Sequence, residues 1–143
     1  MPGSQRAELA DIADRDDVER LVRAFYEKAL VDAEIGYLFE IAQLDLEAHL
    51  PIMVGFWQTM LLGVRAYHRN AFAVHAELHA KEPLTAAHFD RWLALWAQTV
   101  DELFAGERAE LAKAHATRVG RAFALRLSGR RPPLLTVRPL PEG

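Results

Sequence analysis

The chain has 143 residues, the length of about one domain, and 51% of them are hydrophobic, which predicts a folded globular protein. Lys and Arg number 17 against 20 Asp and Glu, and the net charge of −3 excludes a strongly basic nucleic-acid-binding surface. Cysteine is absent, so disulfides, thiolate catalysis and thiolate metal ligands are excluded. The first residues lack an apolar signal core, and no apolar run reaches about eighteen residues. We therefore expect a cytoplasmic protein that binds neither nucleic acid nor membrane.

The first predicted helix begins near Asp16 and ends before Gly36. Its apolar residues recur at spacings of three and four, as one buried face of a helix requires. These residues are Val18, Leu21, Val22, Phe25 and Ala29. A short turn-like piece at residues 35–45 separates this helix from the next one.

The second predicted helix lies within residues 46–63 and carries another apolar stripe. The stripe consists of Met53, Phe56, Trp57, Met60 and Leu61. Gly63 is a natural end for it. Pro51 complicates the start, because proline fits the first turn of a helix but removes a backbone hydrogen bond further inside. We therefore expect His49 at or just before the start of the regular helix.

Three further helical segments follow, of which the first is short and ends at Pro83. The second covers residues 84–106, with Thr85 as the expected N-cap. Its apolar residues in phase are Phe89, Trp92, Leu93, Trp96, Val100 and Leu103. The third covers residues 107–128. Its expected inward residues are Leu111, Val119, Ala122, Phe123 and Leu127.

The predicted elements define an all-α fold class, because no strand pattern, internal repeat or dividing linker is present. We assign residues 1–15 to an N-terminal extension and residues 16–129 to one domain. Residues 130–143 hold four of the seven prolines, so this tail is expected to be extended or disordered.

Two histidines four residues apart, His75 and His79, share one face of the short predicted helix. Such a pair could bind one zinc ion, but a zinc-hydrolase motif needs a glutamate directly after the first histidine, where this chain has Ala76. Glu77 lies two residues from each histidine and points to roughly the opposite face. The pair can also be structural, with His79 exposed and His75 satisfied in the core.

Polar groups on apolar helix faces favour another interpretation. Tyr26 follows the core residue Phe25, His49 precedes Met53 by four residues, and Trp92 lies within an apolar stripe. Each alone is explained by packing, because a buried Tyr or Trp commonly finds a local partner. Together with a histidine on a separate short helix, they provide one metal ligand on one side and hydrogen-bond donors on the other. A planar iron cofactor fits between two such sides.

Five segments, in their order and spacing, resemble the truncated haemoglobins, and within them group III. They are FYEKAL at 25–30, IGYLF at 35–39, HLPIMVGFWQTMLLG at 49–63, YHRNAFAVH at 67–75 and HFDRWLALW at 88–96. The resemblance spans residues 17–128 and implies a shortened globin fold, with two antiparallel helix pairs around haem b. It departs from the family at the HRN that follows Tyr67 and in the Pro-rich tail.

The resemblance also implies roles for individual residues. His75 matches the proximal iron ligand, and Tyr26, His49 and Trp92 match the polar residues of the distal side. Phe39 matches the phenylalanine that stacks on haem. Met53 and Trp57 match positions in the pocket wall, and the other histidines, namely His68, His79, His88 and His115, are expected to be structural or surface residues.

The implied function is the binding of dioxygen, carbon monoxide and nitric oxide at a five-coordinate iron. Donors from Tyr26 and Trp92 are expected to hold dioxygen tightly. Tight binding suits nitric oxide and oxygen redox chemistry better than oxygen storage. A reductase is expected to supply the electrons. A peroxide-reducing haem enzyme or a ligand sensor is the alternative. A zinc-dependent hydrolase or a non-catalytic helical interaction module is a more distant one. His49 is expected to gate the pocket rather than to bind iron.

Overall fold

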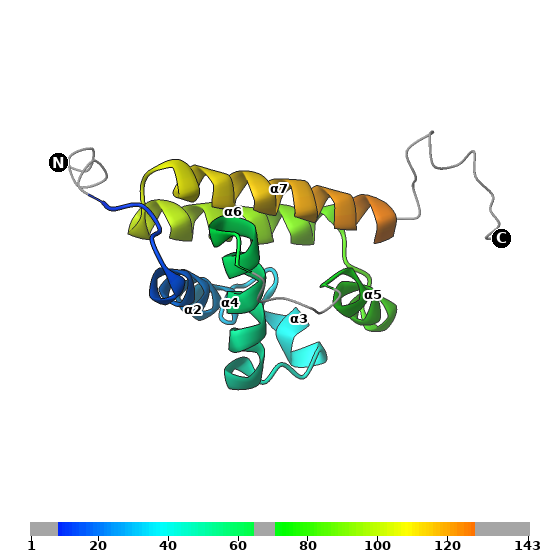
Figure 1. The fold of residues 1–143 in the computed structure, drawn as a ribbon. Helices are drawn as coiled ribbons and strands as arrows, with labels where there is room; N and C mark the ends of the chain where they lie inside the picture. Colours follow the sequence, from blue (N-terminus) through cyan, green and yellow to red (C-terminus); the bar gives the residue numbers. More distant parts are fainter. Residues whose placement is uncertain (1–8, 65–70, 128–143) are drawn as a thin grey trace.

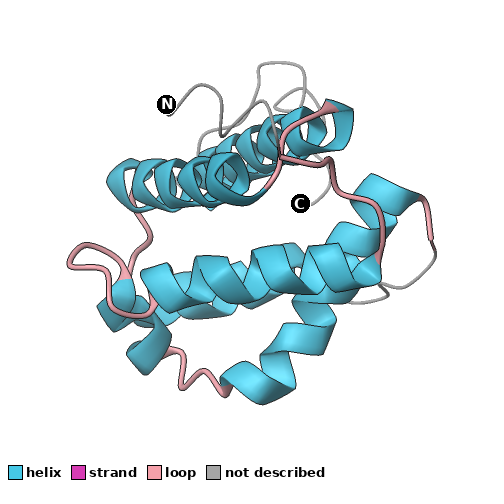
Figure 2. Cartoon of the chain, turned by 90° about the vertical axis from the view of Figure 1, so that its left-hand side faces the viewer, coloured by secondary structure: helices cyan, strands magenta, loops and turns pink. Residues whose placement is uncertain are grey.

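The computed structural model describes residues 9–64 and 71–127, and within these ranges every regular element is a helix. The all-α prediction is thereby confirmed. In chain order, the helices are α2 (Arg15–Ala29), α3 (Gly36–Ile41), α4 (Leu46–Leu62), α5 (Ala71–Lys81), α6 (Ala86–Leu103) and α7 (Glu107–Leu127). Helices α6 and α7 lie side by side and run in opposite directions, and α2 and α4 pack together beneath them (Figures 1 and 2).

Helix α2 forms as the apolar spacing predicts and buries the predicted face. Asp14 is its N-cap, and the Asp14 carboxylate accepts a hydrogen bond from the backbone N–H of Asp17 at 3.0 Å. Tyr26 joins the buried face next to Phe25, and only 6% of Tyr26 is exposed. The helix therefore directs a phenol into the core of the protein.

Helix α4 begins earlier than the sequence suggests, so the expected place of His49 is wrong. Asp45 is the N-cap, and the backbone N–H of His49 already donates to the Asp45 carbonyl at 2.9 Å. Pro51 lies inside the helix, where its missing N–H removes one bond near the N-terminal end without stopping the helix. His49 thus lies within the regular part of α4. Gly63 ends α4 with a φ of 73°, as predicted.

Helix α7 buries small residues rather than the larger ones that its sequence suggests. The buried residues are Ala109, Ala112, Ala116 and Gly120. The inward placement of Leu111 and Ala122 is therefore wrong, since Leu111 is 39% exposed and Ala122 is also exposed. The bulk at this contact comes from α6, whose buried Trp96 donates from Nε1 to the Ala112 carbonyl at 3.1 Å. Small residues on α7 leave room for that ring.

Two residues that the sequence assigns to an N-terminal extension contact the domain. Ile12 is 1% exposed and belongs to the core. The Asp11 carboxylate accepts from the backbone N–H groups of Arg108 and Ala109, each at 2.9 Å, in the first turn of α7. Gly106, which precedes α7, has no side chain that could cap the helix. Asp11, far away in sequence, caps it instead.

Asp11→Ala is expected to lower the free energy of unfolding by about 1–2 kcal/mol at neutral pH, because two helix N–H groups lose their acceptor. Burial opposes ionisation of Asp11, but the hydrogen bonds from Arg108, Ala109 and Ile12 outweigh it and lower the Asp11 pKa. The contribution is therefore present above the ordinary pKa of about 3.9 and is lost as the pH falls through the lowered value. Urea denaturation of both proteins from neutral to acidic pH measures the difference; a gap that widens in acid contradicts the assignment.

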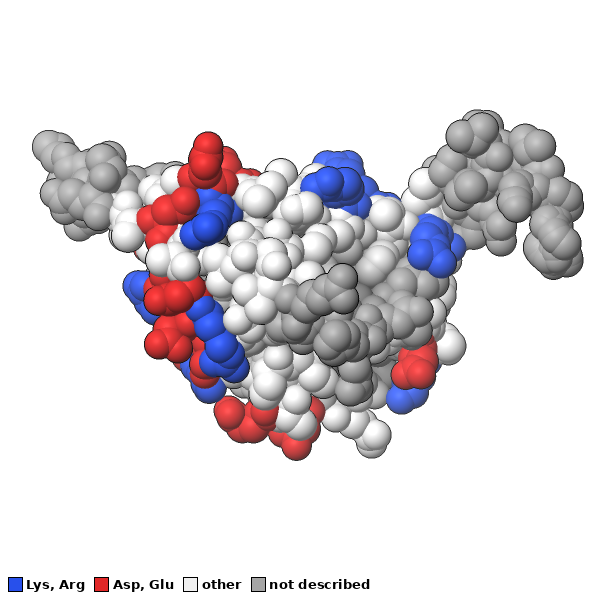
Figure 3. Space-filling view, viewed as in Figure 1, with Lys and Arg blue, Asp and Glu red and all other residues white. Residues whose placement is uncertain are grey.

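Charged side chains on the face seen in Figure 3 are of both signs where they gather, at the end that carries α2. Separately, Arg23 of α2 forms ion pairs with Glu19 and Glu47, at 3.3 and 3.4 Å. On the face seen in Figure 3, the charges at this end do not form a strongly basic patch. Among the described helices, none is both long and apolar enough to cross a membrane.

Candidate functional site

The structure brings Tyr26 of α2 and His49 of α4 into direct contact. The Tyr26 hydroxyl and the His49 Nε2 atom lie 3.0 Å apart, within hydrogen-bond distance, and the two rings meet edge to face. Tyr26 is buried, whereas His49 is half-buried. Burial raises the Tyr26 pKa far above its ordinary value, so the phenol keeps its hydrogen at physiological pH. The pair therefore always contains one hydrogen-bond donor, the phenolic O–H of Tyr26.

The direction of this hydrogen bond decides what Tyr26 can do next. If His49 Nε2 carries no hydrogen, the phenol donates to it and is fully used. If Nε2 carries the hydrogen, His49 donates to the Tyr26 oxygen, and the phenolic hydrogen is available for a third group. A tautomer change or a movement of His49 thus controls the donor capacity of Tyr26.

Trp92 lies near this pair but contacts it through Phe25. The Phe25 ring meets Tyr26 at 5.1 Å and Trp92 at 5.3 Å between centroids, both edge to face. Trp92 also stacks on Trp96 at 5.8 Å, with an angle of 4° between the planes. Trp92 is half-buried, so its indole is packed on one side and accessible on another.

The other residues assigned to the cofactor surround the same region. The Phe39 ring on α3 lies 5.8 Å from the Tyr26 ring, and Met53 is half-buried against the core. Trp57 is 4% exposed and stacks on Trp96 at 4.5 Å. Trp57 therefore packs within the core, and contact of these three residues with a cofactor stays a prediction.

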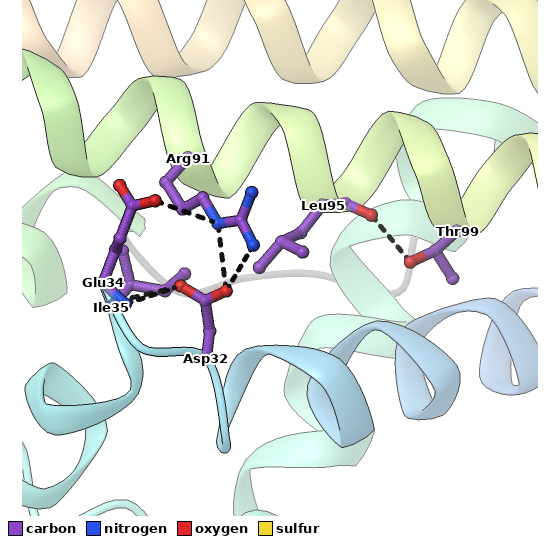
Figure 4. A network of polar contacts seen from close by, with 6 residues as sticks. All are labelled: Asp32, Glu34, Ile35, Arg91, Leu95 and Thr99. Atoms are coloured by element: carbon purple, nitrogen blue, oxygen red, sulfur yellow. Dashed lines mark hydrogen bonds and ion pairs between the residues drawn. The ribbon is translucent and has the colours of Figure 1, made fainter.

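An ion pair that the sequence did not reveal fixes the loop between α2 and α3 to α6. Arg91, next to Trp92, donates from Nε and Nη2 to one oxygen of Asp32, at 2.9 and 2.7 Å (Figure 4). The other Asp32 oxygen accepts from the backbone N–H groups of Glu34 and Ile35. The hydrogen bonds from Arg91 are the main cause of a lowered Asp32 pKa. Residues 59 positions apart share no local pattern, so the sequence does not indicate this ion pair.

His75 stands on a different part of the molecule, on α5. This helix packs chiefly against α7 and α3. The half-buried His75 ring lies between Phe89 of α6 and Phe123 of α7, at centroid distances of 6.4 and 5.1 Å. The site thus divides into an imidazole in an aromatic setting and a separate Tyr26–His49 pair.

His79 has a structural partner, although it shares the face of His75. The His79 Nδ1 atom accepts a hydrogen bond from the backbone N–H of Leu84 at 2.9 Å. A zinc site in a protein normally needs three or more side-chain ligands. Within residues 9–64 and 71–127, no three His, Asp or Glu residues gather closely enough to hold a metal ion. The zinc-hydrolase alternative therefore finds no ligand set there.

The donor set does fit haem, because the porphyrin itself supplies the equatorial nitrogens and the protein needs to supply only one axial ligand. A half-buried imidazole between aromatic rings can provide that ligand. His115 contacts Arg118 on the surface of α7. His68, the HRN sequence after Tyr67 and the Pro-rich tail lie outside the described residues.

The helical arrangement places His75 on α5 and the Tyr26–His49 pair between α2 and α4. The family model for bacterial-like globins matches residues 10–122. A group 3 truncated hemoglobin from Campylobacter jejuni is 26% identical over an alignment of 94 residues, which covers 63% of this chain and 72% of that protein. The crystal structure of the group III truncated hemoglobin from the same species aligns with a TM-score of 0.73 and 23% identity, over 83% of this chain and 94% of that chain.

The chain belongs to the bacterial-like globin family, because the matching model covers most of its length. The sequence resemblance to group III truncated haemoglobins and the predicted globin fold are confirmed. As a globin, the protein is a haem-binding protein, and binding of small diatomic gases such as dioxygen follows from the family.

Proposed function

We propose that this globin holds haem b through His75 and binds dioxygen, carbon monoxide and nitric oxide on the side of Tyr26, His49 and Trp92. Its reaction is nitric oxide and oxygen redox chemistry, supplied with electrons by a reductase in the cytoplasm. The observation that carries the proposal is the separation of the polar groups: His75 stands on α5, whereas the buried Tyr26 bonds His49 between α2 and α4.

Haem held by His75 would supply a ferrous iron at which a bound diatomic gas becomes partly negative. The residues of the chain then act on that charge. Tyr26 keeps its phenolic hydrogen because burial raises its pKa, and it donates that hydrogen when His49 Nε2 acts as the donor to the phenolic oxygen. Trp92 can only donate, from its indole N–H. Both donors favour dioxygen, which becomes polar on binding, over carbon monoxide.

Tight retention of dioxygen favours chemistry over delivery. Each hydrogen bond to a charged ligand contributes about 1.5–3 kcal/mol, which slows dissociation about tenfold or more. A protein that releases dioxygen slowly serves poorly for transport, but it gives nitric oxide time to react. Peroxide reduction uses the same polar side, since a donor and a histidine also polarise an oxygen–oxygen bond, so it remains the second candidate.

The visible absorption spectrum of the purified protein tests the proposal most directly. Expression with added haem should give a red protein with a Soret band and a pyridine haemochrome typical of protohaem. A colourless preparation overturns the proposal. Mixing the dioxygen-loaded protein with nitric oxide should then produce nitrate and ferric protein, whereas turnover only with peroxide favours the second candidate.

His49 is expected to gate the site and not to bind iron, because its Nε2 atom is engaged with Tyr26. The spectra of wild type and His49→Leu, both without added ligand, should then show the same five-coordinate, high-spin iron. Low-spin ferric and ferrous spectra in wild type that disappear in His49→Leu would establish coordination by His49 instead.

A further inference from the structure

The junction between α5 and α6, residues 82–85, is held by two histidine side chains. His79 Nδ1 accepts from the Leu84 N–H at 2.9 Å, and His88 Nδ1 accepts from the Thr85 N–H at 3.1 Å. In return, Thr85 Oγ1 accepts from the His88 N–H at 3.2 Å. This is a capping box in which a histidine occupies the position usually held by glutamate or glutamine. Glu82 is the first residue of the junction. Its backbone N–H donates to the Leu78 carbonyl and so continues the hydrogen-bond pattern of α5.

The hydrogen bond from Thr85 fixes the tautomer of neutral His88. A backbone N–H can only donate, so His88 Nδ1 carries no hydrogen and Nε2 carries it. Nε2 lies 3.0 Å from the Tyr37 hydroxyl of α3 and donates to it. The Tyr37 hydrogen then points to Glu82, whose carboxylate oxygen is 3.4 Å away. Thr85, His88, Tyr37 and Glu82 thus form one directional chain.

Tyr37 keeps its hydrogen for this chain. Desolvation raises the Tyr37 pKa, and the carboxylate of Glu82 raises it further. The chain therefore ends on a negative charge, and its hydrogen bond to that charge is stronger than one between neutral groups. It connects α3, the end of α5 and the start of α6, which carries Phe89 beside the His75 ring.

We propose that His88 is a positioning residue for His75, because its two ring nitrogens join the α5–α6 junction to α3. The proposal rests on the proposed function, in which His75 binds iron. Helix α5 packs chiefly against α7 and α3, and the junction that His88 holds follows directly on the end of α5. Loss of the His88 bonds is therefore expected to move α5, and His75 with it.

Two measurements on the haem-loaded full chain test the proposal. The first is the hydrogen-exchange protection factor of the Thr85 amide, and the second is the iron–histidine stretching band of the ferrous protein in resonance Raman. His88→Ala should lower the Thr85 protection about tenfold and shift the band relative to wild type. His88→Gln retains an acceptor for the Thr85 N–H, so both values should stay near those of wild type.

His115→Gln, a change of a histidine on α7 outside the junction, should behave as wild type. A band that shifts in His88→Gln as far as in His88→Ala, or that is unaffected in His88→Ala, overturns the positioning role. A wild type with no iron–histidine band overturns the proposed function itself, and the Thr85 protection factors then still report separately on the His88 bond.

Discussion

His75→Ala is expected to yield mostly haem-free protein, whereas His79→Ala should remain red. Loss of a group that only orients a metal ligand typically costs about 10–100-fold in metal affinity, so loss of the ligand itself should cost on the order of a hundredfold or more. His79 has another task, since its Nδ1 atom accepts from Leu84. Its replacement should cost about 1 kcal/mol of stability and little haem.

Haem content per protein, measured by pyridine haemochrome after expression with added haem, compares the two variants with wild type. Free imidazole supplies the missing ligand, so adding it to His75→Ala should restore haem binding if the variant is folded. Circular dichroism of the haem-free protein provides the check on folding. A red His75→Ala beside a colourless His79→Ala would reverse the assignment of the iron ligand.

Local spacing predicted the helices well where one face meets the core. The buried face of α2 follows from apolar residues such as Val18, Val22 and Phe25, which recur with the helical period. The same spacing rule wrongly predicts that Leu111 on α7 is buried, because tertiary packing decides which face of α7 turns inward. Trp96 of α6 occupies the space beside Ala112, so the small residues of α7 turn inward and the leucine turns out.

The sequence names candidate members of the site, but only the structure shows the bonds between them. The family resemblance assigns Tyr26 and His49 to one side of the cofactor, yet only the structure shows that the two are bonded to each other. The capping box of Thr85 is not recognisable in the sequence, because His88 stands at the third helical position, where the usual signal is glutamate or glutamine. Asp11 capping α7 is a contact across 97 positions, and periodicity carries no information about such distances.

Tyr26→Phe is expected to raise the dioxygen dissociation rate about tenfold or more, through loss of one charge-assisted hydrogen bond. The carbon monoxide rate should change much less, because that ligand gains less charge. The ring remains, so its edge contacts with Phe25 and Phe39 are preserved, and packing alone predicts no change in either rate. Trp92→Phe should act in the same direction. Stopped-flow measurements of both gases on the three proteins decide between the two accounts.

The Tyr26–His49 bond makes His49→Leu the matched control. If Tyr26 acts only by holding His49, then Tyr26→Phe and His49→Leu should raise the dioxygen dissociation rate equally, and the double variant should add nothing. If Tyr26 itself donates to the ligand, His49→Leu leaves the phenolic hydrogen with no competing acceptor, and its rate should stay well below that of Tyr26→Phe. Slower release in Tyr26→Phe than in wild type contradicts both, and indicates instead that His49 is the donor and that Tyr26 restrains it.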